Sequence, residues 1–255
     1  MISIVIPSKS RPRQLAACLD AIAQLDYDRD RFEVIVVDDG SDTELRSAII
    51  AQMTASNSEL FKTLRLSIVR QKNRGPAAAR NLGVAFAAGE VVVFTDDDCA
   101  PAPDWLIQIE KAVAEYPDCL IGGRIRNALR HNRFSEASQV LVDFLYRYFS
   151  EADSQMYFFA SNNMACRADL FRLVGGFSES FPTAAAEDRE FCYRWLASGH
   201  KLYHQPAALI LHSHELSLSS FFRQHFNYGC GAYLFHKIKA RRAQADLKVE
   251  PLSFY

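Results

Sequence analysis

The sequence predicts an α/β fold, with a mostly parallel central sheet and helices on both faces. Apolar runs rich in β-branched residues alternate with segments of helical periodicity along the first half of the chain, an order typical of parallel sheets. Several of these runs are apolar throughout, as in strands that are buried on both faces. Two of them end in acidic clusters. Because ligands of such sheets bind beyond the carboxyl ends of the strands, both clusters fall where a binding site is expected.

Strands and helices alternate through the first hundred residues. Pro7 is expected to halt the first strand. Gly75 and Pro76 precede an alanine-rich helix that Gly89 ends, because proline suits the first turn of a helix and glycine suits its end. The expected elements are the strands 2–6, 33–37, 64–69 and 91–94 and the helices 13–24, 44–55 and 77–88.

The pattern is looser in the second half, where aromatic residues become frequent. Gly175 and Gly199 are expected to end two helices. The expected elements are the helices 104–116, 134–149, 167–174 and 187–198, the strands 120–125, 200–203 and 208–212, a last helix from about residue 218, and a charged helical tail over 237–248. We expect two subregions on one continuous sheet.

Composition excludes several classes of protein. The chain has 255 residues, of which 49% are hydrophobic and 23% charged, values typical of a folded soluble protein. The net charge of −1 gives no overall attraction for nucleic acid. Six cysteines without a C-x-x-C pair argue against a zinc ribbon and favour a reduced, cytoplasmic setting. Without an apolar run of about 18 residues, we expect a protein that is soluble or peripheral to a membrane.

Three aspartates follow the expected strand 91–94. Asp96 and Asp98 point to the same side of an extended segment, because side chains alternate along it. Two carboxylates on one edge suit Mg²⁺ or Mn²⁺, and a cation would offset their repulsion. The alternative is an acidic turn exposed to solvent.

A second acidic loop, Asp38-Asp39-Gly40-Ser41, follows the expected strand 33–37. Asp39 could accept the imide N–H of a uracil base, although these residue types also form ordinary turns. Arg80 and Asn81 lie near the start of the alanine-rich helix, where donors suit an anionic phosphate. The two acidic loops together therefore predict a site for a nucleotide and a metal ion.

Four motifs in this order resemble glycosyltransferase family 2, whose members have the GT-A fold, a Rossmann-like sandwich. The resemblance covers about residues 1–215. It implies the inverting transfer of a sugar from a nucleotide diphosphate donor, with a divalent metal ion holding the diphosphate. The motifs are SIVIPS at 3–8, VVDDGS at 36–41, GPAAARNLG at 75–83 and FTDDD at 94–98.

The resemblance also implies roles for single residues. Asp98 would be the metal ligand proper, Asp96 would lie against the ribose and the metal, and Asp97 would be the variable middle residue. His212 matches a histidine that completes the metal site in related enzymes, and His214 could substitute for it. The residues expected to bind the nucleotide are Pro7, Ser8, Arg11, Asp39, Arg80, Asp96 and Asp97.

An acidic pair, Glu187-Asp188, opens a helix in the second half and also matches the family. A carboxylate there could deprotonate an acceptor hydroxyl as it attacks the anomeric carbon. We expect Asp188 to be the base, with Glu187 as the alternative. The other interpretation is a pair that only stabilises the start of its helix.

The aromatic segment 221–231 contains Arg223 and His225. Similar segments in relatives close over the diphosphate, so either side chain could neutralise the leaving group. The aromatic residues at helical spacing could equally form core, or they could press on a membrane surface where lipid-linked acceptors reside.

The resemblance implies a metal-dependent enzyme that transfers one sugar, with a UDP-sugar as the default donor, for cell-wall or polysaccharide biosynthesis. Neither the Q-x-x-R-W motif of processive synthases nor a membrane helix follows. The acceptor would be a sugar, a lipid-linked or a small molecule, reached in the cytoplasm or at the cytoplasmic face of the membrane. We expect residues 1–100 to bind the donor, 101–216 to bind the acceptor, and 217–255 to form a C-terminal helical segment.

Two other functions stay open at this point. A non-catalytic protein that binds nucleotide sugars would keep the sheet, although the Glu187-Asp188 pair argues against it. A sugar nucleotidyltransferase would share the sheet, but the N-terminal region has no glycine-rich loop with a following arginine and lysine. A NAD enzyme is disfavoured because G-x-G-x-x-G does not follow the first strand.

Overall fold

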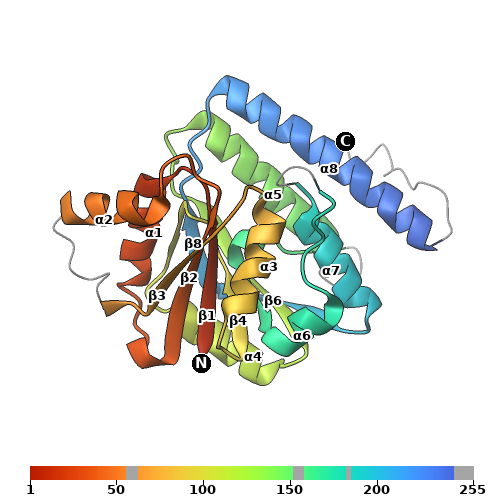
Figure 1. Cartoon of the computed structure of the whole chain (residues 1–255). Coiled ribbons are helices and arrows are strands. Elements are labelled where there is room, and N and C mark those ends of the chain that lie inside the picture. Colours follow the sequence, from red (N-terminus) through yellow and green to blue (C-terminus); the bar gives the residue numbers. More distant parts are fainter. Residues whose placement is uncertain (56–62, 152–157, 182–184, 244–255) are drawn as a thin grey trace.

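A computed structural model describes residues 1–55, 63–151, 158–181 and 185–243. One continuous sheet runs through the described chain, and helices lie on both of its faces (Figure 1). The strands are β1 (Ile2–Ser8), β2 (Phe32–Asp39), β3 (Leu66–Gln71), β4 (Val91–Phe94), β5 (Cys99–Pro101), β6 (Cys119–Asn127), β7 (Met164–Arg167) and β8 (Lys201–His212). The helices are α1 (Pro12–Ile22), α2 (Leu45–Ala55), α3 (Pro76–Phe86), α4 (Trp105–Glu115), α5 (Arg133–Glu151), α6 (Ala168–Val174), α7 (Glu187–Ala197) and α8 (Leu218–Ala243).

The strand order is β3-β2-β1-β4-β7-β6-β8-β5. The pairs β3-β2, β2-β1, β1-β4 and β6-β8 are parallel, whereas β7 is antiparallel to β4 and β6, and β5 is antiparallel to β8. The predicted α/β class with a mostly parallel sheet is therefore confirmed. The antiparallel strand β7, which the sequence pattern did not predict, joins the two halves.

Several expected strand boundaries were wrong, and the strand expected over 64–69 is β3, which runs from Leu66 to Gln71. Pro7 does not halt β1, because the strand continues to Ser8. Past Val5 this strand pairs with β2 alone, so the ladder is open on one side and a residue without an N–H is accommodated. The two strands expected over 200–212 are one strand, β8, whose pairing with β6 shifts register after Gln205, next to Pro206.

The core has one layer on each face of the sheet. Along β1, Ile4 and Ile6 face the layer that includes α1 and α4, whereas Val5 faces the layer that includes α3, α6 and α7. This alternation is what a central strand requires, since successive side chains point to opposite faces. Large aromatic side chains fill both layers, with Trp105 in the first and Phe177, Phe191 and Trp195 in the second.

The long helices α5 and α8 pack against each other at one end of the molecule (Figure 1). The rings of Phe134 and Phe221 are 5.8 Å apart between centroids. The expected helical tail over 237–248 is confirmed as far as Ala243, and the rest lies outside the described residues. Among the described helices, none has both the length and the apolar character to cross a bilayer.

Candidate active site

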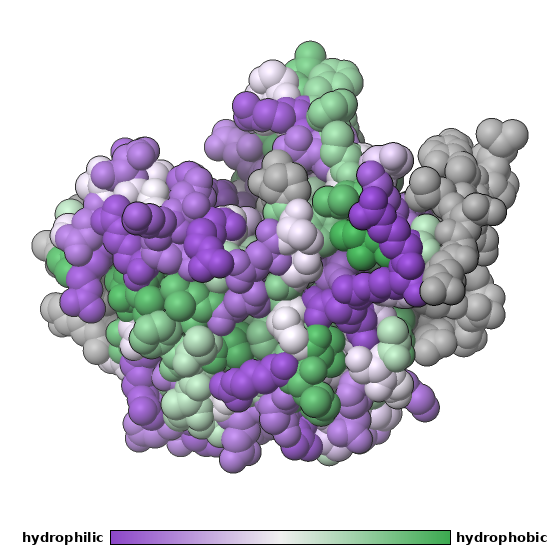
Figure 2. All heavy atoms as spheres, turned by 45° about the vertical axis from the view of Figure 1, so that its right-hand side comes forward, coloured by the Kyte–Doolittle hydropathy of each residue, from purple (hydrophilic) through white to green (hydrophobic). Residues whose placement is uncertain are grey.

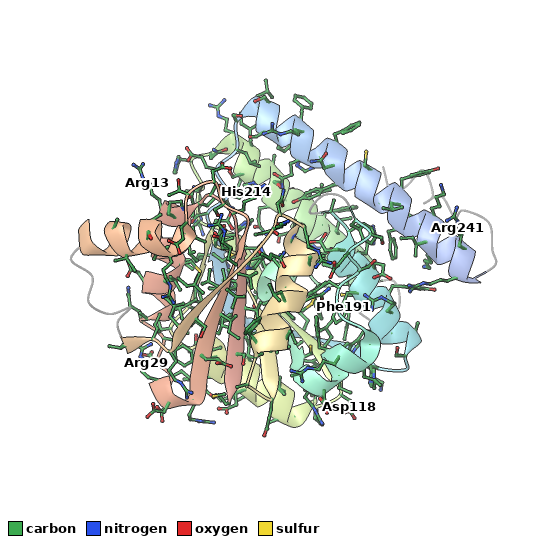
Figure 3. The ribbon with its side chains drawn as sticks, in the orientation of Figure 1. Arg13, Arg29, Asp118, Phe191, His214 and Arg241 are labelled. Atoms are coloured by element: carbon green, nitrogen blue, oxygen red, sulfur yellow. The ribbon has the colours of Figure 1, made fainter. Side chains whose placement is uncertain are left out.

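The two acidic clusters follow the carboxyl ends of β2 and β4, which lie at one edge of the sheet, the edge toward His214 in Figure 3. These ends lie at the same edge because β2 and β4 flank β1 in parallel. The Ser8 hydroxyl, at the end of β1, donates to Asp97 Oδ2 over 2.6 Å. The sequence therefore predicted correctly which strand ends come together.

Asp98 and His212 are adjacent across the antiparallel pair of β5 and β8. His212 Nε2 lies 3.2 Å from Asp98 Oδ1, and Arg11 Nη2 lies 2.7 Å from Asp98 Oδ2. Burial opposes ionisation of Asp98, but His212 and Arg11 outweigh it and hold the pKa of this carboxyl well below its usual range. Burial likewise acts to lower the pKa of His212, but the bond to Asp98 raises it. His214, which the sequence offered as a substitute for His212, packs beside it, with the two ring centroids 5.2 Å apart.

These side chains offer donors for a divalent cation. Ligand atoms of Asp98, Cys99 and His212 lie within 4.8 Å of one another in the described part of the chain. Carboxylate oxygen and imidazole nitrogen suit Mn²⁺ and Mg²⁺. Burial raises the pKa of the Cys99 thiol well above its usual range, which leaves the oxygen and nitrogen donors as the fitting set.

Asp97 is turned into the protein and is 3% exposed. Besides the bond from Ser8, its Oδ1 lies 2.7 Å from Arg11 Nη1. Burial outweighs both partners and raises the pKa of Asp97 to about 7. The residue expected to be variable is therefore a buried link between β1, Arg11 and the segment after β4.

Stability without metal should therefore fall as the pH rises. Between about pH 4 and about pH 7 the folded state holds a proton on Asp97 that the unfolded chain has released, so folding loses free energy as the pH increases. Asp97→Asn cannot ionise. In EDTA, the melting temperature of the variant relative to that of the wild type should therefore be higher at about pH 8 than at about pH 5. If the two melting temperatures differed by the same amount at both pH values, a raised pKa of Asp97 would be contradicted.

Arg80 joins the acidic edge to the second half of the chain. Its guanidinium is 4% exposed, with Nη2 at 2.7 Å from Asp96 Oδ1 and Nη1 at 3.2 Å from Glu187 Oε1. The guanidinium carbon also lies 5.7 Å from the ring centroid of Phe177. The Nε atom has no partner within the described residues. The sequence placed Arg80 near a phosphate, whereas its link to Glu187, 107 positions away, was missed.

Glu187 is buried and Asp188 is half-buried at the start of α7, and their environments differ. Burial and the neighbouring Asp188 raise the pKa of Glu187 to about 7, against the opposing charge of Arg80. Burial also raises the pKa of Asp188, which accepts bonds from the backbone N–H groups of Arg189 at 2.7 Å and Ser161 at 3.4 Å. Glu187 is thus paired to a cation, whereas the hydrogen bonds to Asp188 come from backbone.

Asp39 holds a loop that borders an open pocket of about 460 Å³. The loop is fixed to it because Gln71 Nε2 donates to Oδ1 over 2.7 Å, and the backbone N–H groups of Arg74 and Gly75 donate over 2.8 and 2.9 Å. Asp39 is thereby 5% exposed. The pocket is lined by Gly40, Arg70, Gln71, Lys72 and Asn73.

Gly40 keeps this loop close to the end of β2. Its φ of +76° lies in the left-handed region, and a Cβ there would meet the backbone nitrogen of Asn73 at 2.7 Å. A larger residue would therefore push the loop away from Asp39. The sequence motif identified the position, and the loop contacts explain why glycine occupies it.

The segment 221–231 lies on helix α8. Arg223 is exposed on α8, and the ring of His225 packs 4.1 Å from that of Phe221 between centroids. Tyr228 is 39% exposed, and its hydroxyl accepts a hydrogen bond from Gln224 Nε2 over 2.6 Å. Burial of the hydroxyl and the charge of Asp188 raise the pKa of Tyr228 to about 12, against the bond from Gln224. The aromatic spacing of this segment indicated a helix but not the direction in which each side chain points.

Known proteins resemble the chain in sequence and in structure. It is 27% identical to the pre-mycofactocin glycosyltransferase of Mycobacterium tuberculosis over 235 residues, which cover 91% of this chain and 46% of that protein. It is 28% identical to the chondroitin synthase of Escherichia coli over 239 residues, which cover 78% of this chain and 32% of the synthase. The chain therefore spans less than half the length of these relatives.

Solved structures show the same fold. The mannosyltransferase PcManGT of Pyrobaculum calidifontis, in complex with GDP-Man and Mn²⁺, matches with a TM-score of 0.75 and 22% identity over 98% of this chain and 66% of that one. TarS 1–349 of S. aureus in complex with UDP matches with a TM-score of 0.63 and 18% identity over 90% and 64%. The GT-A fold is thereby confirmed. The model of glycosyl transferase family 2 matches residues 3–175, more than half of the sequence, and the chain therefore belongs to that family.

Proposed function

We propose that the chain is a metal-dependent, inverting and non-processive glycosyltransferase that moves one sugar from a UDP-sugar to an acceptor hydroxyl. The observation that carries this proposal is the arrangement of carboxylates on the two sides of Arg80. Asp96 and the metal-ligand pair of Asp98 and His212 lie on one side, and Glu187 with Asp188 lies on the other. One site thus offers ligands for a diphosphate-bound cation beside candidates for a general base.

Asp98 and His212, with Asp96 beside them, would hold the cation. When bound, Mn²⁺ or Mg²⁺ would neutralise charge on the diphosphate as it leaves. The mannosyltransferase neighbour is complexed with Mn²⁺, and this supports the choice of metal.

Asp188 would accept the proton of the acceptor hydroxyl. The acceptor oxygen forms a bond to the anomeric carbon from the face opposite the diphosphate, and the bond from that carbon to the diphosphate breaks with its electron pair on the leaving oxygen. Attack from the opposite face inverts the anomeric centre. Burial raises the pKa of Asp188, which makes its carboxylate a stronger base than one in water.

We assign donor binding to residues 1–100 and acceptor binding to residues 101–216. The C-terminal segment 217–255 is described as far as Ala243, where helix α8 ends. We assign the nucleoside to the pocket beside Asp39. Pro7 and Ser8, which pair with Val37 and Asp38 at the end of β2, belong to the same assignment. The acceptor would be a sugar, lipid-linked or small molecule used in cell-wall or polysaccharide synthesis. We retain the prediction that Arg223 or His225 neutralises charge on the leaving diphosphate.

Donor hydrolysis tests the function. The chain is incubated with UDP-, GDP- and dTDP-sugars and Mn²⁺ without acceptor, and free nucleotide is measured. We expect nucleotide release from a UDP-sugar that stops in EDTA. Release from GDP-sugars alone would overturn the assignment of uridine. Nucleotide binding without hydrolysis, or without transfer to any acceptor offered, would favour a non-catalytic binding protein instead.

Asp39→Ala should weaken nucleotide binding while the requirement for metal stays. The variant loses the acceptor for the base and also the acceptor of three loop hydrogen bonds. A hydrogen bond to a charged group contributes about 1.5–3 kcal/mol, so the affinity should fall roughly tenfold or more. Calorimetry with UDP and Mn²⁺ measures it, and an unchanged affinity would leave Asp39 as a turn residue only.

A further inference from the structure

Helix α8 carries a row of exposed apolar side chains. Leu218, Phe222, Phe226 and Tyr233 are 54%, 63%, 72% and 61% exposed. Steps of four, four and seven residues place them on one face of the helix. We call these four residues the α8 row.

The opposite side of α8 holds the helix on the protein. Phe235 is buried there, and its ring centroid lies 6.0 Å from that of Tyr193 in α7. Arg242 Nη1 lies 3.2 Å from the buried Glu190 Oε1. Because these contacts and those to α5 anchor α8, the α8 row is not required to hold the helix in place. It faces outward by the geometry of the helix.

The charge of α8 has one sign. Residues 218–243 contain no aspartate or glutamate. Lys237 and Arg241 follow Tyr233 at intervals of four residues, so they extend the face of the α8 row. Arg223 lies next to Phe222. All three basic side chains are exposed. Figure 2 shows green hydrophobic and purple hydrophilic residues next to each other along the top of the molecule, where α8 lies in Figure 1.

We propose that α8 docks on the surface of an anionic lipid bilayer. The α8 row enters the boundary between headgroups and acyl chains, and Lys237 and Arg241 contact the lipid phosphates. An apolar face bordered by arginine and lysine is the pattern of helices that lie in the membrane interface, and basic residues near an anionic surface add attraction. The adjacent helix α5 also exposes apolar residues, namely Val140, Leu141 and Phe144.

Charge favours a bilayer over a second copy of the chain. A symmetric dimer through α8 would bring the α8 rows of two copies together, and with them two sets of basic residues without an acidic partner on the same helix. Anionic lipids supply the missing opposite charge. The proposal does not rest on the proposed function, because docking requires neither donor nor catalysis.

Vesicle sedimentation tests the docking with the whole 255-residue chain. The wild type should sediment with vesicles of phosphatidylcholine mixed with phosphatidylglycerol, and at least about fivefold less with phosphatidylcholine alone. The double variant Phe222→Ser/Phe226→Ser, and separately Lys237→Gln/Arg241→Gln, should each lower the partition coefficient about tenfold. Phe86→Ser/Leu173→Ser is the matched control, because it removes residues of 58% and 74% exposure from α3 and α6.

The outcomes are distinct. The control should sediment like the wild type, and circular dichroism should verify that every variant is folded. A wild type that stays in the supernatant with both lipid mixtures overturns the proposal, as does equal binding by the Phe222/Phe226 variant. Light scattering that finds a dimer in the wild type and a monomer in that variant, without vesicle binding, assigns the face to a second copy instead.

Discussion

Asp188→Asn is expected to lower sugar transfer by about 10²–10⁴-fold while donor and metal binding stay near wild type, the range typical of a positioned general base. Asparagine keeps the volume of the side chain and one oxygen that can accept the backbone N–H of Arg189. It cannot take a proton from the acceptor. Steady-state transfer, with donor affinity measured by calorimetry, should therefore separate turnover from binding.

Glu187→Gln is the comparison that makes this result specific. Glu187 is the partner of Arg80, which also holds Asp96. Its neutral variant leaves Arg80 with one carboxylate, so we expect donor affinity to change as well as rate. A fully active Asp188→Asn beside an inactive Glu187→Gln would transfer the role of base to Glu187. If both variants remained active, the proton acceptor would lie outside α7.

Asp98→Ala should abolish metal-dependent binding of the nucleotide diphosphate. The substitution removes an anionic ligand, and it also releases Arg11 and His212 from a carboxylate at 2.7 and 3.2 Å. With one of few ligands lost, the diphosphate faces the remaining carboxylates without a cation between them. Calorimetry with UDP and Mn²⁺, repeated in EDTA, measures this effect.

Asp118→Ala is the matched control, because Asp118 is an exposed aspartate at the opposite end of the sheet from His214 (Figure 3). It should bind UDP like the wild type. In the wild type, EDTA should remove binding as completely as Asp98→Ala does. Unchanged UDP affinity, either in the variant or in wild type with EDTA, would sink the metal assignment.

The sequence could predict the acidic edge because topology determines it: parallel pairing brings β2 and β4 to the same end of the sheet. The expected alternation of Asp96 and Asp98 along an extended segment was wrong, because these residues lie in a turn that the Cys99 N–H closes by donating to the Asp96 carbonyl. Asp97 and Asp98 therefore share Arg11, whereas Asp96 contacts Arg80. The position of His212 followed from the family motif, and its proximity to Asp98 agrees with that expectation. The metal role of the pair stays a prediction that the Asp98 experiment tests.

Other features depend on tertiary contacts that no local pattern encodes. β7 has four residues and β5 has three, too few to establish a period, and their partners lie far away in the sequence. The contact of Arg80 with Glu187 depends on how α3 and α7 pack. The direction in which Arg223 and His225 point depends on the rotation of α8 about its axis, which is set by anchors such as Phe235 and Phe221.

The antiparallel strand β7 also limits how the two halves can move. It bonds to β4 on one side and to β6 on the other, so the strands of the two halves belong to one ladder of backbone hydrogen bonds. A hinge between the halves would have to break that ladder, unlike a hinge between domains joined by a linker. Distances between groups at the ends of β4 and around residues 161–163 are thus set when the chain folds, and any adjustment to substrate falls to loops and to α8.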